Sequence, residues 1–347
     1  MKTLQTDVVI VGKGIAGLCL SLLLERQGIE HLLLSRRERK EIALAETLPP
    51  SALQLLERLG FRALFSKSAL KKTLGYHSLW GTPEVVDTNF YFYRPFQHGL
   101  KLDKQKLLRI LAAEVPERVL EFDKAMSYRG AEAGIHTGIN GEATCIKGKL
   151  YIDATGRNRA FLKQLGVGSI DQDQQLAFSC HLPRINHPRL VHDVFTEIFP
   201  GGWGIVSGLN EQTNVMTLFA EKGSPNALKL KDFGEWEGIL KGTRYLKTYL
   251  SPGISPTVKG SAANSSRAEE IAGANWLAVG DAAIAFDPLS SHGISNAVYC
   301  AWRASEAVQK YLSHPQERPL LGYAEMLSKI FEQYLAVQRR LRLGLVT

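Results

Sequence analysis

Five residues near the N-terminus have the types and spacing of a turn that binds nucleotide phosphates: Gly12, Gly14, Ile15, Ala16 and Gly17. A β-branched run at residues 8–11 precedes them and a helical apolar pattern at residues 18–26 follows, which predicts a strand, a glycine turn and a helix. Glycine here permits a tight turn, close approach of a pyrophosphate and close packing of helix on strand. The first N–H groups of the helix would then face the phosphates.

The end of the next strand departs from this pattern. We expect that strand at residues 31–34, followed by an Asp or Glu that binds a ribose hydroxyl, about 20 residues after the glycines. Ser35 stands there instead, followed by Arg36 and Arg37. Two guanidinium groups would suit the 2′-phosphate of NADP, because Arg binds phosphate through paired charge-assisted hydrogen bonds. The segment alone leaves three interpretations open: an NADP site, an FAD site and a solvated charge run.

A second glycine turn lies late in the chain and favours a flavin. Gly280 ends an apolar strand pattern, and the carboxylate of Asp281 can accept hydrogen bonds from a polyol such as a ribityl chain, which nicotinamide cofactors lack. Pro288, Gly293 and Ile294 then lead into a long helix. The positive end of such a helix stabilises the negative charge of a reduced flavin.

The composition excludes several other classes of protein. The net charge of +8 comes from scattered Lys and Arg, which suits an anionic cofactor or an acidic partner protein and does not predict a nucleic-acid surface. The four cysteines lie far apart without a CxxC pair or a His cluster at metal spacing, so we expect no disulfide framework and no metal site. The chain begins almost directly with a strand and has no apolar run of about 18 residues, so we expect a cytoplasmic protein without a membrane span.

The remaining patterns predict the other elements. Residues 175–221 contain only strand patterns, with a hairpin turn at residues 200–202. The aromatic stretch within residues 76–100 predicts a strand pair or platform. We expect these further elements: a short helix after Pro49 and Pro50, the aromatic strands within residues 76–100, a helix at residues 101–115, β segments within residues 119–156, helices within residues 228–250 and an amphipathic helix over residues 320–345.

Three blocks of the sequence resemble FAD-dependent monooxygenases that share the p-hydroxybenzoate hydroxylase fold. These are the glycine motif, residues 151–161 (YIDATGRNRAF) and residues 280–294 (GDAAIAFDPLSSHGI), which together span nearly the whole chain. Segments such as residues 45–50 (AETLPP) and 201–205 (GGWGI) are most similar to the tryptophan-halogenase-like branch. Within that branch, the chain is most similar to the flavoproteins that mature cysteine tryptophylquinone oxidases of the glycine- and lysine-oxidase type.

The resemblance implies an α/β fold in which a Rossmann-like FAD-binding domain of the glutathione-reductase type carries an inserted, mostly β substrate domain and C-terminal helices. We place the domains as follows: the discontinuous FAD-binding domain at residues 1–75, 100–170 and 265–315, the substrate domain at 76–99 and 171–264, and the C-terminal helix at 316–347. The implied cofactor is FAD.

The resemblance also assigns roles to individual residues. Gly12, Gly14 and Gly17 would hold the pyrophosphate, Asp281 the ribityl region, and Gly293 with Ile294 the isoalloxazine edge. The full set of implied FAD-binding residues is Gly12, Gly14, Ile15, Ala16, Gly17, Ser35, Arg36, Lys104, Asp153, Gly280, Asp281, Pro288, Gly293 and Ile294. Two of these depart from the family, since Ser35 replaces Glu and Lys104 replaces Arg, which keeps the charge but loses the planar fork. We therefore expect loosely held FAD, which Ser35→Glu should tighten.

The implied activity is hydroxylation of a Trp side chain in the precursor of a quinone-cofactor oxidase, through a flavin C4a-(hydro)peroxide. An external reductant or transiently bound NAD(P)H would supply electrons, since there is no second GxGxxG motif. Halogenation is disfavoured because Trp203 stands alone where halogenases carry a Trp-x-Trp-x-Ile-Pro block. Hydroxylation of a free aromatic molecule and a non-catalytic flavin-binding chaperone remain the alternatives. The candidate catalytic residues are His292, Glu46 and Trp203, with Trp80 and His98 as further cavity residues.

Overall fold

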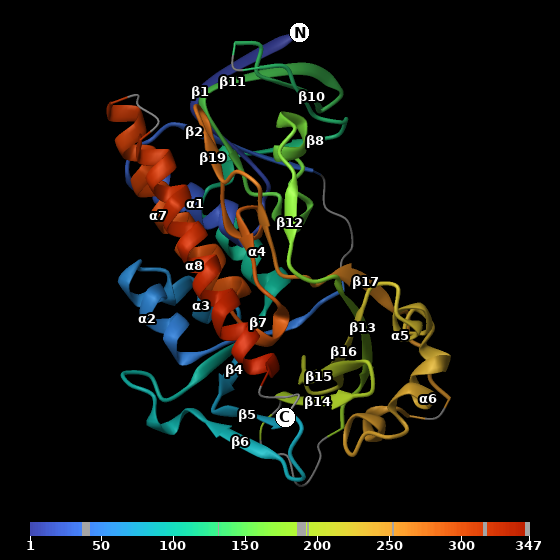
Figure 1. Cartoon of the computed structure of the whole chain (residues 1–347). Coiled ribbons are helices and arrows are strands. Elements are labelled where there is room, and N and C mark those ends of the chain that lie inside the picture. Colours follow the sequence, from blue (N-terminus) through green and yellow to red (C-terminus); the bar gives the residue numbers. More distant parts are fainter. Residues whose placement is uncertain are drawn as a thin grey trace. The chain divides into compact units, whose positions relative to one another are not determined.

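Strand β1 (Lys2–Val11) is the centre of a mixed sheet (Figure 1). Val8, Val9 and Ile10 in its second half are fully buried. Parallel neighbours on both sides, β11 (Glu142–Asp153) and β2 (His31–Arg36), explain why this stretch is continuously apolar, since a central parallel strand is covered on both faces. The predicted strand, turn and helix are confirmed, with the helix α1 (Ile15–Arg26) beginning at Ile15 and β2 reaching Arg36.

The structure is a computed structural model that describes residues 1–36, 42–130, 132–185, 192, 194–251, 253–314 and 318–343, with side chains to residue 338. The chain divides into two compact units. Unit 1 comprises Met1–Arg39, Leu108–Asp171 and Ser266–Thr347, and unit 2 comprises Lys40–Leu107 and Gln172–Ser265. Among the described residues, the helices are too short or too polar to cross a membrane.

The mixed sheet of unit 1 continues beyond β1, β2 and β11 in the order β19-β20-β11-β1-β2-β8-β10-β9. A smaller sheet has the order β12-β18-β21. The strands not yet given are β8 (Val119–Phe122), β9 (Ser127–Tyr128), β10 (Ile135–Ile139), β12 (Ser169–Asp171), β18 (Ser266–Ala268), β19 (Ala272–Gly273), β20 (Trp276–Ala278) and β21 (Ile284–Ala285).

Three helices cover this sheet. Helix α1 is buried along nearly its whole length, as expected for a helix that is apolar on all sides, and packs against α7 (Gly293–Ser313). Helix α8 (Arg318–Leu343) packs against α7, and the hydroxyl of Tyr323 on α8 donates a hydrogen bond to the carbonyl of Ala278 in β20 at 3.0 Å. The C-terminal helix is therefore an integral part of unit 1.

Unit 2 is built on two sheets. The larger has the order β17-β13-β16-β15-β14-β5-β6 and the smaller β3-β7-β4. Their strands are β3 (Ala45–Leu48), β4 (Ala69–Thr73), β5 (Gly75–Leu79), β6 (Val86–Asn89), β7 (Gly99–Asp103), β13 (Gln175–Pro183), β14 (Val194–Phe199), β15 (Gly202–Gly208), β16 (Thr213–Glu221) and β17 (Lys259–Ala262). The predicted hairpin turn at residues 200–202 is confirmed, because β14 and β15 pair antiparallel across it.

Short helices complete both units. The α-helices are α2 (Pro50–Arg58), α3 (Arg62–Lys67), α4 (Lys104–Ala113), α5 (Pro225–Lys229) and α6 (Trp236–Leu240). The 3₁₀ helices are η1 (Phe90–Phe92), η2 (Pro116–Arg118), η3 (Gly156–Asn158), η4 (Leu162–Leu165), η5 (Phe233–Glu235), η6 (Leu246–Tyr249), η7 (Gly280–Ala282) and η8 (Pro288–Ser290). Fully buried Trp236 packs α6 into a core with the larger sheet of unit 2.

The expected α/β fold is confirmed, whereas two details differ. Residues 101–103 are strand and not helix, because β7 pairs with both β3 and β4 and buries Leu100 and Leu102. The same pairing groups residues 40–75 and 100–107 with unit 2, although we assigned them to the FAD-binding domain.

Candidate cofactor site

The turn between β1 and α1 needs glycine at two positions. Gly12 has φ +119°, and a Cβ atom there would lie 2.3 Å from the carbonyl oxygen of Ala154. A Cβ on Gly17 would lie 2.0 Å from the carbonyl oxygen of Gly12. Both distances are far below van der Waals contact, so these glycines let the turn, the helix and the segment after β11 approach one another.

Gly14 has a different role, because it borders open space. It is the N-cap of α1, where a Cβ would meet only the carbonyl oxygen of Ala154 at 3.9 Å. Among the described residues, no side chain caps this helix, and its first turn carries no acidic residue. The N–H groups at the helix start, including those of Ile15 and Ala16, are therefore available to an anion such as a pyrophosphate.

The end of β2 carries Ser35, as the sequence indicated. Its hydroxyl donates to the carbonyl oxygen of Arg36 at 3.0 Å, and the Arg36 side chain is exposed, while Arg37 lies outside the described residues. A carboxylate nevertheless lies beside Ser35, because Glu121 is its direct partner in β8. Lys13 of the glycine turn forms an ion pair with Glu121, with Nζ and Oε1 2.8 Å apart. A carboxylate is thus present on the strand next to β2, where it pairs with Lys13.

Asp153 holds the loop that follows β11. The side chain is fully buried and accepts hydrogen bonds from the backbone N–H groups of Thr155, Phe161 and Leu162 at 2.7, 3.1 and 2.9 Å. The hydroxyl of Thr155 donates a further bond. Burial raises the pKa of Asp153, and these hydrogen bonds oppose the rise. The carboxylate is directed into its own loop, so its contribution to a cofactor site is to position that loop.

Arg159 is not among the predicted site residues, but it connects four segments of unit 1. This buried residue donates from Nε to the carbonyl oxygen of Ala282, from one terminal nitrogen to the hydroxyl of Ser169 and from the other to the hydroxyl of Ser266, each at 3.0 Å. The planar guanidinium satisfies all three acceptors with one side chain. Arg159 thereby fixes the turn that carries Gly280 and Asp281.

The late glycine turn lies against the first one. Gly280 has φ +60°, and a Cβ there would lie 2.8 Å from the Cβ of Ala16 at the start of α1. The next residue, Asp281, is 31% exposed and pairs with Arg157, whose Nε lies 3.4 Å from a carboxylate oxygen. Arg157 also donates to the carbonyl oxygen of Phe286 at 2.6 Å. The two glycine motifs, more than 250 residues apart in sequence, are therefore neighbours in unit 1.

The start of α7 is the second open helix end. A Cβ atom on Gly293 would have no described atom within 4 Å, and no side chain in the described chain caps α7. His292 occupies the N-cap position, exposed, with its ring against Phe286. Ile294 is buried, whereas Pro288 is exposed and begins η8, which the side chain of Asp287 caps.

These features fit FAD. A pyrophosphate matches the open glycine at the start of α1, a ribityl chain matches the partly exposed carboxylate of Asp281, and a flavin edge matches the open glycine at the start of α7. The three lie in one unit, where Gly280 and Ala16 hold the two turns together. When bound, FAD would supply the redox chemistry, and the chain would supply binding and orientation.

The other predicted residues belong to unit 2. Lys104 at the start of α4 lies 3.6 Å from the carboxylate of Glu46 in β3, so the fold brings two predicted residues into one ion pair. Trp203 in β15 is buried, stacks on Phe219 with ring centroids 3.9 Å apart and meets Trp80 edge-on. Trp203 and Trp80 thus form one aromatic cluster that packs on the sheet.

His98 lines a basic hollow of about 290 Å³ in unit 2. Arg62, Lys71 and Lys72 contribute positive charge to the same hollow. Burial lowers the pKa of His98, and the nearby Lys72 and Arg62 lower it further. The hollow is electrostatically suited to an anionic group.

One lysine of unit 2 is buried, which the sequence patterns did not predict. Lys101 lies on β7, opposite Thr47 of β3, with its side chain removed from solvent. Burial lowers its pKa to about 7, and the positive charges of Lys71 and Arg184 contribute. In the sequence Lys101 alternates with Leu100 and Leu102, which is typical of an exposed position on a half-buried strand.

Replacing Arg159 tests the anchoring of the late glycine turn. Arg159→Lys keeps the charge but cannot reach all three acceptors, and each lost charged hydrogen bond costs about 1.5–3 kcal/mol. We expect the Kd for FAD to rise at least about tenfold, measured by flavin fluorescence titration of the apoprotein. Arg129→Lys, at an exposed position, is the matched control and should leave the Kd unchanged. A folded Arg159→Lys variant with unaltered FAD affinity would contradict the role of Arg159.

The pairing of Ser35 with Glu121 modifies the expected effect of Ser35→Glu. A new carboxylate at position 35 would lie directly opposite Glu121, and like charges in that arrangement repel. We expect Ser35→Glu alone to change FAD affinity little. The double variant Ser35→Glu with Glu121→Gln should bind FAD about tenfold more tightly than the single variant, because one ribose–carboxylate bond forms without repulsion. Equal affinities of the single and double variants would refute this coupling.

Comparisons with known proteins agree with FAD as the cofactor. The family model described as "FAD binding domain" matches residues 5–334. LodB of Marinomonas mediterranea, named as a FAD-dependent oxidoreductase, is 23% identical over 96% of this chain and 92% of its own. The structure of QhpG, a peptidyl tryptophan dihydroxylase essential for tryptophylquinone cofactor biogenesis, aligns with a TM-score of 0.74 and 18% identity over 97% of this chain and 74% of QhpG.

A halogenase shares the fold as well. The FAD-dependent chondrochloren halogenase CndH, which is myxobacterial, aligns with a TM-score of 0.77 and 20% identity over 96% of this chain and 82% of the halogenase. At these identities the structural matches establish the fold and not the substrate. The family match covers almost the whole chain and agrees with the two open helix ends of unit 1. The chain therefore belongs to the FAD-binding domain family and is a FAD-dependent oxidoreductase.

Proposed function

We propose that this chain is a monooxygenase that hydroxylates a Trp side chain in the precursor of an oxidase with a tryptophylquinone cofactor. The observation that carries the proposal is the likeness in fold to QhpG, a peptidyl tryptophan dihydroxylase, over 97% of this chain. The similarity to LodB, a FAD-dependent oxidoreductase, over nearly the full length of both chains supports the flavin chemistry.

The reaction inserts one oxygen atom into an aromatic C–H bond of the indole. One O₂ supplies that atom, its second oxygen leaves as water, and two electrons come from NAD(P)H, which is oxidised to NAD(P)⁺. When bound, FAD would supply the redox chemistry that activates the oxygen. The residues of the chain then have three tasks, which are to bind the cofactor, to hold the Trp side chain in a dry site and to accept the proton that leaves the ring.

Several exposed apolar side chains within one segment of unit 2 support a protein substrate. They are Leu74, Tyr76, Tyr91, Phe92 and Tyr93. Phe92 is 83% exposed and Tyr91 is 61% exposed. Such a group of apolar side chains is uncommon on a surface without a partner, and aromatic residues are enriched in protein interfaces. The basic hollow that contains Lys71 and Lys72 lies on the same polypeptide segment and suits acidic groups of a partner.

His292 is the residue that we assign to proton transfer. It stands at the start of α7, beside the open Gly293 where a flavin edge fits. Desolvation by the surrounding chain lowers its pKa, and the charge of Asp287 partly opposes this effect. A neutral imidazole can accept the proton released when the hydroxylated ring regains aromaticity. In unit 2, Glu46, which pairs with Lys104, and Trp203 are the further residues that we propose for catalysis.

Mass spectrometry of a mixture with the unmodified oxidase precursor tests the proposed reaction. With FAD, NAD(P)H and O₂, we expect at least one added oxygen atom on a Trp of the precursor. Phe92→Ser should lower the yield at limiting precursor about tenfold or more, because truncating an interface anchor costs at least about 1–2 kcal/mol. Leu228→Ser, which also replaces an exposed apolar side chain of unit 2, should behave as the unmodified chain.

Other outcomes of that experiment separate the alternatives. Oxygen added to free aromatic molecules but never to the precursor would favour a small-molecule hydroxylase. A stable complex without any mass change would favour a flavin-binding chaperone. Either result would refute the proposed function.

The pH dependence tests His292. A base acts in its deprotonated form, so hydroxylation should be slow at low pH and rise to a plateau as His292 loses its proton. Because the pKa of His292 is lowered, the midpoint of this rise should lie below the ordinary histidine value of about 6.5. His292→Gln should remove the dependence and lower kcat by about 10²-fold. A retained rise with the same midpoint in His292→Gln would assign it to another group.

A further inference from the structure

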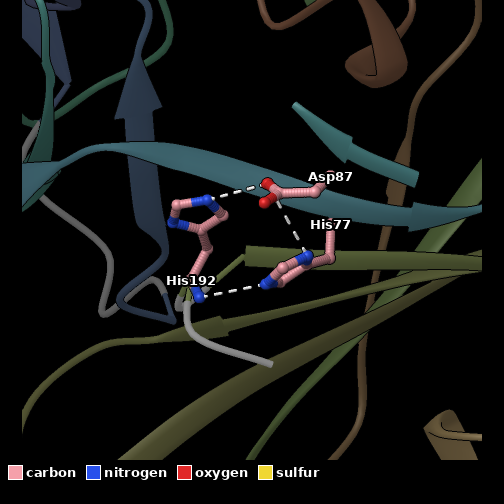
Figure 2. A group of neighbouring side chains, drawn as sticks. All are labelled: His77, Asp87 and His192. Atoms are coloured by element: carbon pink, nitrogen blue, oxygen red, sulfur yellow. Dashed lines mark hydrogen bonds and ion pairs between the residues drawn. The ribbon is translucent and has the colours of Figure 1, made fainter. Parts of the chain in front are cut away.

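Two histidines and an aspartate converge in unit 2, and none of the three is among the residues assigned to FAD. His77 lies in β5, Asp87 lies in β6 and is the direct strand partner of His77, and His192 lies just before β14. Strand β14 pairs with the other side of β5. Two neighbouring strands and a residue close to the start of a third thus bring three potential metal ligands to the same place, as Figure 2 shows.

The spacing of the ligand atoms suits a small cation. Nε2 of His192 lies 3.0 Å and Nδ1 of His77 lies 3.9 Å from the same carboxylate oxygen of Asp87, and the three atoms fall within 4.8 Å of one another. Bonds of about 2.0–2.2 Å to Zn²⁺ place tetrahedral ligand atoms about 3.4 Å apart. Small side-chain shifts would therefore bring all three atoms to a common ion.

The burial of His77 supports a bound ligand at Nδ1 of its ring. His77 is only 4% exposed, and Nδ1 makes no hydrogen bond to any described residue. A buried polar atom without a hydrogen bond is costly, so native structures usually provide one or a bound ion or water. Burial lowers the pKa of His77, and the charge of His192 lowers this pKa further, while Asp87 opposes the shift.

The surroundings hold His192 in place as well. A Cβ on Gly75 would lie 2.7 Å from Nε2 of His192, so glycine at this position leaves room for the imidazole. The rings of His77 and His192 lie 4.7 Å apart, and the backbone N–H of His192 donates to Nε2 of His77 at 3.2 Å. Asp87 is about half exposed, which leaves one side of the group open to water.

We propose that His77, Asp87 and His192 form a binding site for a divalent transition metal ion of the Zn²⁺ type. Two imidazole nitrogens and one carboxylate oxygen are ligands that such ions prefer, and water from the open side would complete a tetrahedral shell. On binding, the proton of each neutral imidazole moves to the nitrogen that does not face the ion. Nε2 of His77 then no longer accepts the 3.2 Å hydrogen bond from the backbone N–H of His192, and this loss lowers the affinity for the ion.

The ion would cross-link the edge strand of the larger sheet in unit 2 to its neighbours. Strand β6 is the last strand in its order, and edge strands are held by one neighbour only. A metal ion bound to β6, β5 and the segment before β14 adds a cross-link between all three. Its expected consequence is greater thermal stability of unit 2 and no change in the cofactor.

The test uses the FAD-loaded chain without an affinity tag, freed of metal with a chelator and titrated with Zn²⁺ alone by calorimetry. We expect one saturable site per chain and a rise in Tm with Zn²⁺. Asp87→Asn and His77→Gln should each weaken binding about 100-fold, while His314→Gln, at an exposed position in unit 1, should bind as the unmodified chain does. Circular dichroism and retained FAD verify folding. Co²⁺ bound at the same site should give d–d absorption at wavelengths longer than the flavin bands.

Two results would overturn the proposal. One is the absence of a saturable site in the unmodified chain, a measurement that requires no variant. The other is Zn²⁺ affinity that stays unchanged in folded Asp87→Asn. Because the titration measures neither hydroxylation nor partner binding, failure of the proposed function would leave this result standing, and the reverse is also true.

Discussion

The close approach of Gly280 to Ala16 is the constraint on which the cofactor site depends. A side chain of any size at position 280 would collide with the start of α1, and side chains at positions 12 and 17 would collide with backbone oxygens. With glycine at all three positions, two strand-to-helix turns meet at one end of the unit 1 sheet. The starts of α1 and α7 are then left without side-chain caps among the described residues. These unsatisfied N–H groups are what an elongated, anionic cofactor can satisfy.

The surrounding side chains stabilise this arrangement, and few of them are directed toward a ligand. Asp153 and Arg159 are both buried and both direct their polar atoms into neighbouring loops. Their removal would therefore act on the cofactor through the backbone. Asp281 differs, since its partly exposed carboxylate can reach outward. The division between buried positioning residues and exposed contacts is what a preorganised binding site requires.

The sequence predicted the parts of the site that depend on local patterns. A strand, a glycine turn and a helix follow from adjacent residues, and so does the glycine before α7. Glu121, Lys101 and the group of His77, Asp87 and His192 depend on strand pairing, which the sequence does not reveal. The expectation of no metal site rested on spacing along the chain, whereas these three potential ligands become neighbours only through β5, β6 and β14. Residues 101–103 were misassigned as helix for the same reason, since β7 pairs with β3 and β4, which both lie much earlier in the sequence.

We predict that FAD is the resident cofactor, despite Ser35 at the position that suggested NADP. The visible spectrum of the purified chain, together with chromatography of the cofactor released by heat, tests this most directly. We predict the absorption bands of oxidised flavin and release of intact FAD. A chain without flavin that instead binds NADPH tightly would contradict the account.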